Sequence, residues 1–139
     1  MIAKHKSQKA QSSNKTQMDK NQNTNRYRQL ENRTTEFAKN IIRLCKEMKE
    51  DSINRPLINQ IIRSSGSVGA NYREANEALG KKDFVHRLRI ARKEAKETQH
   101  WLELIEEANP ELSEKMKGLF RETQELRNIL SSIINKVCL

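Results

Sequence analysis

The sequence predicts an all-α protein, an up-and-down antiparallel four-helix bundle that follows a disordered basic N-terminal arm. Apolar residues recur at steps of three and four through four stretches, which is the spacing of helices that each bury one face. The composition agrees, because 35% hydrophobic and 32% charged residues suit narrow apolar seams rather than a thick core. Only 4 Gly and 2 Pro argue against a β-fold rich in turns.

The arm is expected to comprise residues 1–28 and the bundle residues 29–139, as one domain with a tail. The arm has too little apolar surface to offset the entropy of ordering it. It holds seven Lys or Arg and one acid, a net +6 of the formal +9 of the chain. A basic balance favours polyanions, either nucleic acid or an anionic membrane surface. Composition leaves open whether the arm binds a polyanion or only aids solubility.

The apolar pattern and its breaks set the expected helix boundaries. We expect helices over about Leu30–Lys49, Arg55–Ala78 and Lys82–Ala108, and a fourth that starts at Asn109-Pro110-Glu111 and carries apolar residues as far as Val137. Pro56 fits the first turn of the second helix, Gly80 its C-terminal cap, and Asn109 the cap of the fourth. Links this short predict antiparallel neighbours.

The second helix contains an unusual run of small residues, Ser64–Ala70. The apolar pattern resumes in phase after Gly69, which favours one continuous helix over two short helices joined by a loop. Gly66 and Gly69 would each cost such a helix about 1 kcal/mol relative to Ala, so we expect the backbone there to approach a neighbour closely. Asn71, at the edge of the apolar seam, is expected to make a structural hydrogen bond that fixes helix register.

The same run carries a family resemblance. Residues 67–75, Ser-Val-Gly-Ala-Asn-Tyr-Arg-Glu-Ala, resemble the signature of the four helix bundle protein family, also called the 23S rRNA intervening sequence protein family. The resemblance continues through residues 81–86 and 97–108 and covers roughly residues 33–137. It implies a small up-and-down bundle that assembles into homopentamers, and some members are encoded within ribosomal RNA genes. A related branch is the accessory subunit of diversity-generating retroelement reverse transcriptases.

The third helix carries three lines of side chains. One is an apolar seam from Phe84 to Ile105. On the opposite side is a line without any acid, here called the basic row, which comprises Lys82, His86, Arg89, Lys93, Lys96 and His100. A row of this kind can track phosphates, although charged rows are more often a solvated helix face. Without interleaved aromatic residues, it does not indicate sequence-specific readout or stacking of single-stranded bases.

The third line, here called the Trp101 line, is the predicted oligomer interface and comprises Ile90, Glu94, Glu97, Trp101 and Leu104. A monomeric bundle needs one seam per helix, so large apolar groups outside that seam favour a contact surface. The second helix offers a different flank with Ile58, Ile62, Ser65 and Gly69, so the two could dock head to tail and close into a ring. Arg63 or Arg73 would pair with Glu94 and Glu97 there. The alternative is that Trp101 covers the edge of its own bundle.

The sequence provides no catalytic constellation. Glu97 and His100 have the Glu-x-x-His spacing of di-iron bundles, but the second copy that such a site needs is missing, so no metal or other cofactor is expected. Cys45 and Cys138 have no disulfide or zinc spacing, which favours reduced thiols in the cytoplasm. No apolar run is long enough to span a membrane, and no signal peptide follows Met1.

The sequence is compatible with two functions, and neither is enzymatic. The first is an oligomeric bundle that binds RNA or DNA through its basic surface, which the resemblance extends to a partner of a reverse transcriptase or of an rRNA intervening sequence. The second is a protein–protein interaction scaffold whose charge serves solubility. The charge pattern favours nucleic acid without deciding between RNA and DNA.

Overall fold

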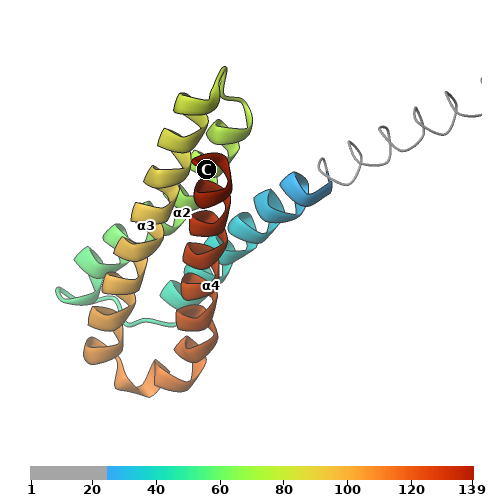
Figure 1. Ribbon diagram of the computed structural model, residues 1–139. Coiled ribbons are helices and arrows are strands. Elements are labelled where there is room, and N and C mark those ends of the chain that lie inside the picture. Colours follow the sequence, from blue (N-terminus) through green and yellow to red (C-terminus); the bar gives the residue numbers. More distant parts are fainter. Residues whose placement is uncertain (1–24) are drawn as a thin grey trace, which may run out of the picture. The chain divides into compact units, whose positions relative to one another are not determined.

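The computed structural model describes residues 25–139 (Figure 1). Of the arm predicted for residues 1–28, residues 1–24 lie outside the described range. Residues 25–28, which the sequence assigned to the arm, belong to a helix that runs to residue 46. They read Asn-Arg-Tyr-Arg, without Gly or Pro, and Arg is a good helix former, so nothing local ends the helix at Leu30.

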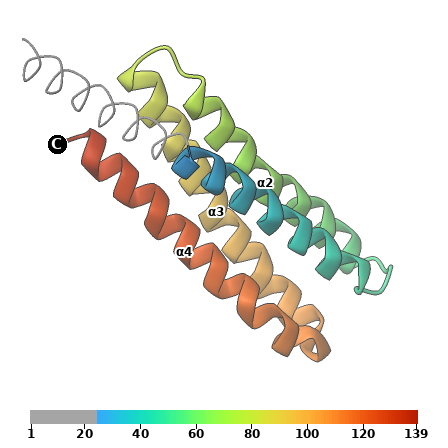
Figure 2. The same ribbon diagram turned by 90° about the vertical axis from the view of Figure 1, so that its right-hand side faces the viewer.

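Residues 33–139 form one compact unit, which contains the bundle. After the N-terminal helix come α2 (Asn54–Asn76), α3 (Lys81–Ala108), a 3-10 turn (Pro110–Leu112) and α4 (Ser113–Val137). Within the described residues there is no β-strand. Helix α3 packs against both α2 and α4, and Figure 2 shows it between them. The predicted all-α four-helix bundle is confirmed.

The seams predicted from the sequence form most of the core. In the N-terminal helix Phe37, Ile41 and Leu44 are buried. In α3, Leu88, Ala91, Ala95, Thr98, Leu102 and Ile105 are all buried, whereas Phe84 is half-buried and Val85 is buried in its place. In α4 the seam shifts near its end, where Ile134 is buried and Ile133 and Val137 are half-buried. A straight helix drifts about 20° per heptad from a strict seven-residue repeat, which accounts for such shifts.

Helix α2 is continuous through its small residues, as the sequence predicted, but only one of its two glycines meets a neighbour. A Cβ atom on Gly69 would lie 2.9 Å from Thr34 Oγ1 and 3.2 Å from Thr34 Cβ, so this glycine lets α2 approach the N-terminal helix. A Cβ atom on Gly66 would have nothing within 4 Å. The expectation of a close approach at Gly66 was therefore wrong, because that position faces open space.

The link between α2 and α3 also differs from the prediction. Helix α2 ends at Asn76, and Gly80 is the N-cap residue of α3, where its carbonyl accepts the amide N–H of Phe84 at 3.0 Å. Gly80 is therefore not the C-terminal cap of α2. Leu79 lies beyond the helix, in the four-residue link where the chain reverses direction, and is fully exposed.

Buried polar side chains join α2 to α3. Asn54 and Asn109 exchange two amide hydrogen bonds, of 3.1 and 2.9 Å, at one end of the helix pair. Asn109 therefore makes no side-chain cap at the following turn, contrary to the prediction. Further along, Thr98 Oγ1 donates to Ser64 Oγ at 2.8 Å. Paired amides and hydroxyls of this kind satisfy buried polar groups and fix the register of the two helices.

Asn71 adds a third link between the same helices. Its Nδ2 donates to the Ser67 carbonyl at 2.9 Å, and Arg87 Nη1 of α3 donates to its Oδ1 at 3.3 Å. This is the structural kind of bond that the sequence predicted for Asn71.

Candidate nucleic-acid interface

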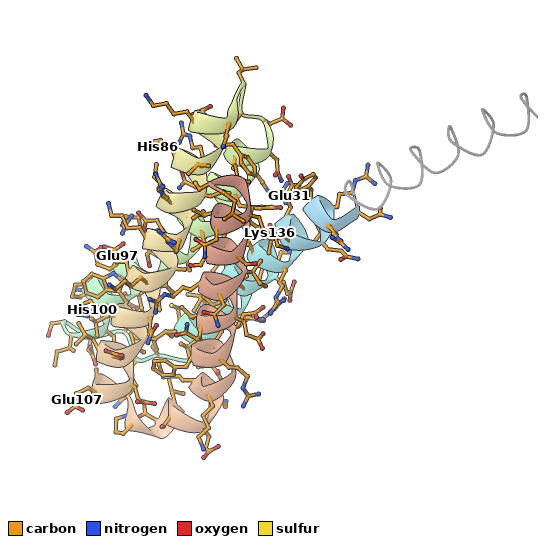
Figure 3. All side chains as sticks on the ribbon, in the orientation of Figure 1. Glu31, His86, Glu97, His100, Glu107 and Lys136 are labelled. Carbon is orange, nitrogen blue, oxygen red and sulfur yellow. The ribbon has the colours of Figure 1, made fainter. Side chains whose placement is uncertain are left out.

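The basic row lies on the outer face of α3. Lys82, His86, Arg89, Lys93, Lys96 and His100 are all exposed. Figure 3 shows His86 and His100 projecting from the same side of the helix. At 1.5 Å per residue, the row is roughly 27 Å long. Because the buried residues of α3 repeat on the opposite side, the core of the bundle holds this row rigid and facing outward.

The cations of the row are unpaired. Among the described residues, none of the six has a hydrogen bond or an ion pair, and His100 only packs edge-on against Trp101 with ring centroids 5.0 Å apart. Several cations elsewhere on the bundle are paired. Arg33, for example, contacts Glu122 at 2.6 Å and Glu125 at 2.5 Å. Unpaired cations keep their charge available for phosphates.

A shallow hollow continues the basic surface from α3 toward α4. It is lined by Lys93, Lys96, Glu97, Gln99, His100, Glu103 and Arg127. Arg127 of α4 donates through Nη1 to Gln99 Oε1 at 2.8 Å, which holds its guanidinium beside the row. Arg127 was not predicted from the sequence, because it stands among core residues of α4 and only the packing of α4 on α3 brings it here.

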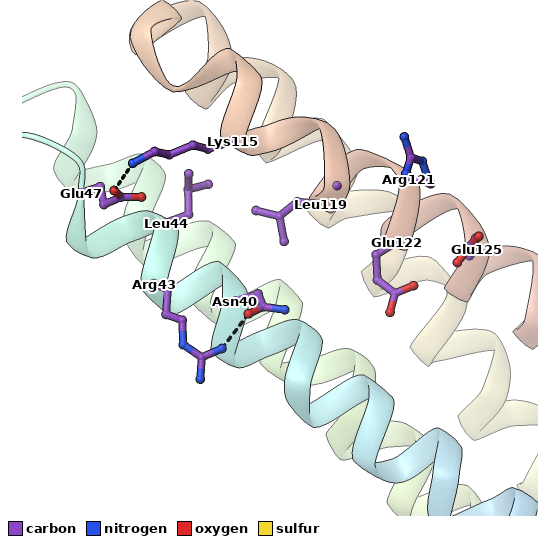
Figure 4. Close-up of a pocket in the computed structure, with 10 residues that line it drawn as sticks. Asn40, Arg43, Leu44, Glu47, Lys115, Leu119, Arg121, Glu122 and Glu125 are labelled. Carbon is purple, nitrogen blue, oxygen red and sulfur yellow. Dashed lines mark hydrogen bonds and ion pairs between the residues drawn. The ribbon is translucent and has the colours of Figure 1, made fainter.

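A second hollow, between the N-terminal helix and α4, has a different character (Figure 4). Its lining includes Arg43, Lys115 and Arg121, which are matched in number by Glu47, Glu122 and Glu125. Lys115 pairs with Glu47, and Arg43 donates to Asn40 Oδ1 at 2.6 Å. Because the charges are balanced in number and most of them are paired, this hollow is a poorer phosphate surface than the basic row.

The Trp101 line lies on the side of α3 that faces α2. Ile90 and Trp101 are half-buried, and Leu104 is 40% exposed. The Trp101 Nε1 atom is buried and has no hydrogen-bond partner among the described residues. Trp101 therefore covers part of its own bundle, and the exposed part of its side chain lies on the same line as the exposed Leu104.

Glu94 and Glu97 find their cation within the same chain. Arg63 Nη1 of α2 lies 3.2 Å from Glu94 Oε2, outside hydrogen-bonding geometry, and its Nη2 contacts Glu97 Oε2. Arg73, the other candidate, donates through Nη2 to Thr35 Oγ1 at 3.2 Å. Burial raises the pKa of Glu94, as does neighbouring Glu97, and Arg63 opposes the rise. Glu94 and Glu97 thus contact Arg63 of the same chain, whereas the sequence-based expectation placed this ion pair across an oligomer interface.

The α2 flank proposed to receive the Trp101 line is only partly available. Ser65 and Gly69 are buried, because α2 packs there against the N-terminal helix. Ile58 is half-buried and Ile62 is 40% exposed. A contact on this flank is therefore limited to the two isoleucines and their surroundings.

Other kinds of site receive no support from the described residues. No group of three His, Cys, Asp or Glu side chains among residues 25–139 is placed to hold a metal ion. None of the described helices combines the length and apolar character that crossing a membrane requires. Cys45 and Cys138 are both free, and burial raises the pKa of the Cys45 thiol to about 11, which makes it a poor nucleophile.

The sequence matches a family model over most of its length. The model describes the 23S rRNA-intervening sequence protein and matches residues 28–132. This chain belongs to the 23S rRNA-intervening sequence protein family. A crystal structure from Bacteroides thetaiotaomicron, described as a protein with unknown function from the S23 ribosomal protein family, is 35% identical. The two superpose with a TM-score of 0.72 over 78% of this chain and 97% of that one. Among curated proteins, none matches this chain.

Proposed function

We propose that this member of the 23S rRNA-intervening sequence protein family is a non-enzymatic, oligomeric protein of the cytoplasm that binds RNA or DNA. One observation carries the proposal: the six side chains of the basic row are exposed, unpaired and in line on one rigid helix face. The family name supports a role close to nucleic acid. The partners that fit are the RNA of an rRNA intervening sequence or the nucleic acid handled by a reverse transcriptase.

The salt dependence of binding tests this proposal. Four residues of the row are lysine or arginine, namely Lys82, Arg89, Lys93 and Lys96. If each neutralises one phosphate, the log–log slope of affinity against salt should be about −3.6 for a duplex and about −2.8 for a single strand. Affinity for a duplex should then fall roughly 150-fold between about 50 and 200 mM salt. Fluorescence anisotropy measures the salt slope for each of three labelled ligands, namely an RNA hairpin, a DNA duplex and a single strand. No binding at the lowest salt would favour the interaction-scaffold function instead.

Oligomerisation is the second part of the proposal, and the exposed Leu104 beside half-buried Ile90 and Trp101 supports it. We expect these residues of one subunit to pack on the Ile58–Ile62 side of α2 of the next, which is a head-to-tail contact that closes into a ring. The family resemblance suggests five subunits. The same surface would serve an interaction scaffold with no nucleic-acid role, so the parent's failure to bind nucleic acid would leave this contact unaffected.

Light scattering coupled to size exclusion tests the assembly on the parent and on Leu104→Glu and Trp101→Glu. A charge buried in an apolar contact destabilises it strongly, so both variants should elute as smaller species than an oligomeric parent. Leu104→Glu is the sharper variant because its side chain is 40% exposed and should leave the fold intact. A monomeric parent at tens of micromolar would end the oligomer proposal. Variants with the parent's mass would exclude this face.

A further inference from the structure

Three carboxylates stand beside the basic row, and one arginine of the neighbouring helix holds two of them. The third, Glu103, lines the hollow and has no ion pair among the described residues. Arg63 of α2 reaches Glu94 and Glu97 of α3. Glu97 also lines the hollow that contains Lys93, Lys96 and His100. An acid that would oppose phosphate binding therefore lies within the basic surface, where its charge is paired with a cation of another helix.

The helical spacing gives Glu97 two other partners. Lys93 precedes it by four residues and His100 follows it by three, and side chains at these spacings meet on a helix surface. Neither pair forms in the described structure, and the ion pair of Glu97 is with Arg63. The direction in which Glu97 turns thus decides whether Lys93 and His100 stay unpaired.

We propose that Arg63 is a positioning residue for the basic row. By drawing Glu97 toward α2, it keeps that carboxylate from pairing with Lys93 or His100 and leaves both free for phosphate groups. This inference rests on the proposed nucleic-acid function and adds a residue of α2 to a surface that otherwise comes from α3.

Arg63 suits this role for two reasons. Its planar guanidinium offers several N–H donors in a fixed geometry, so it can contact two carboxylates at once, as it does here. Its ion pair with Glu97 joins side chains that are 47% and 37% exposed, so this pair contributes little to folding. Glu94 is only 12% exposed, but burial raises its pKa and so favours the neutral form that it can adopt when Arg63 is removed. Glutamine at position 63 should therefore leave the bundle folded while releasing Glu97.

A double-mutant cycle tests the inference with Arg63→Gln, Glu97→Gln and both together, each titrated with a labelled RNA hairpin. Arg63→Gln should weaken binding about eightfold at 0.1 M salt and reduce the salt slope by about 0.9, which is one phosphate contact. Glu97→Gln should change the parent's affinity less than about twofold, because Arg63 already neutralises that acid. In the Arg63→Gln background, it should restore the affinity and the slope.

Additive charge effects give a different result, which makes the cycle decisive. If net charge alone mattered, Glu97→Gln would strengthen binding equally in both backgrounds, and that outcome would overturn the positioning role. Unchanged affinity in Arg63→Gln would overturn it as well. A parent that binds no hairpin at low salt would overturn the proposed function and this inference with it. If the parent binds the hairpin and the two substitutions show no coupling in affinity, the proposed function is supported and only this inference is wrong.

Arg55→Gln is the matched control for loss of charge. Arg55 is also on α2, is 63% exposed, and lies 4.0 Å from Glu50 rather than near the row. It should change affinity far less than Arg63→Gln. Thermal unfolding of each variant checks that the helix content and the cooperativity of the parent are kept.

Discussion

Glutamine in place of Arg89, Lys93 and Lys96 together is expected to weaken binding of an RNA hairpin by on the order of 500-fold at 0.1 M salt. Each cation that neutralises a phosphate of a duplex contributes a factor of about eight at that salt, because it releases about 0.9 of a counterion. Three such factors multiply to several hundred. The salt slope should fall at the same time from about −3.6 to about −0.9. Folding should be unaffected, since all three side chains are exposed and unpaired.

The control for this variant removes the same charge elsewhere. Lys39, Lys46 and Arg121 are also exposed, on the N-terminal helix and α4, and glutamine at these three positions gives the same net charge. If the basic row is the contact surface, the control variant should keep a slope near that of the parent. Equal losses in both variants would mean that the nucleic acid responds to the overall charge of the protein and has no preferred face.

The fold could be predicted from the sequence because its information is local. Seams such as Leu88, Ala91, Ala95 and Leu102 repeat with the period of a helix, and burial of one face per helix leaves few arrangements other than a bundle. The exposure of the basic row follows from the same periodicity, since a line opposite a buried seam must face outward. Its unpaired state could not be predicted, because pairing depends on which acids the neighbouring helices bring close.

Apart from residues 25–28, which extend the N-terminal helix, the differences concern contacts between helices or a change of chain direction. Arg127 reaches the basic surface only through the packing of α4 on α3, and Asn109 gives up its capping role because Asn54 lies within reach. Arg63 was expected to meet Glu97 across a subunit interface, and the structure forms this ion pair within one chain. Periodicity gives the face on which a residue lies, but not which residue of the next helix stands opposite.

The two glycines of α2, Gly66 and Gly69, look alike in sequence and differ in the structure. Leucine at Gly69 is expected to lower the free energy of unfolding by about 3 kcal/mol or more, because overpacking of a tight contact costs that much. Even the first added atom, Cβ, would lie 3.2 Å from Thr34 Cβ, which is tied to the backbone of the N-terminal helix. The two helices would have to separate. Chemical denaturation followed by circular dichroism measures the loss.

Leucine at Gly66 is the matched control and should have the opposite sign. Gly66 is exposed in the interior of the same helix and has nothing within 4 Å of an added Cβ atom, so only helix propensity acts there. Removing a glycine from such a position should raise the free energy of unfolding by about 0.5–1 kcal/mol. Opposite signs for one substitution at two positions three residues apart would separate backbone approach from propensity as the reason for each glycine. A stability gain at both positions would show that α2 and the N-terminal helix can move apart at little cost, and that Gly69 does not set their distance.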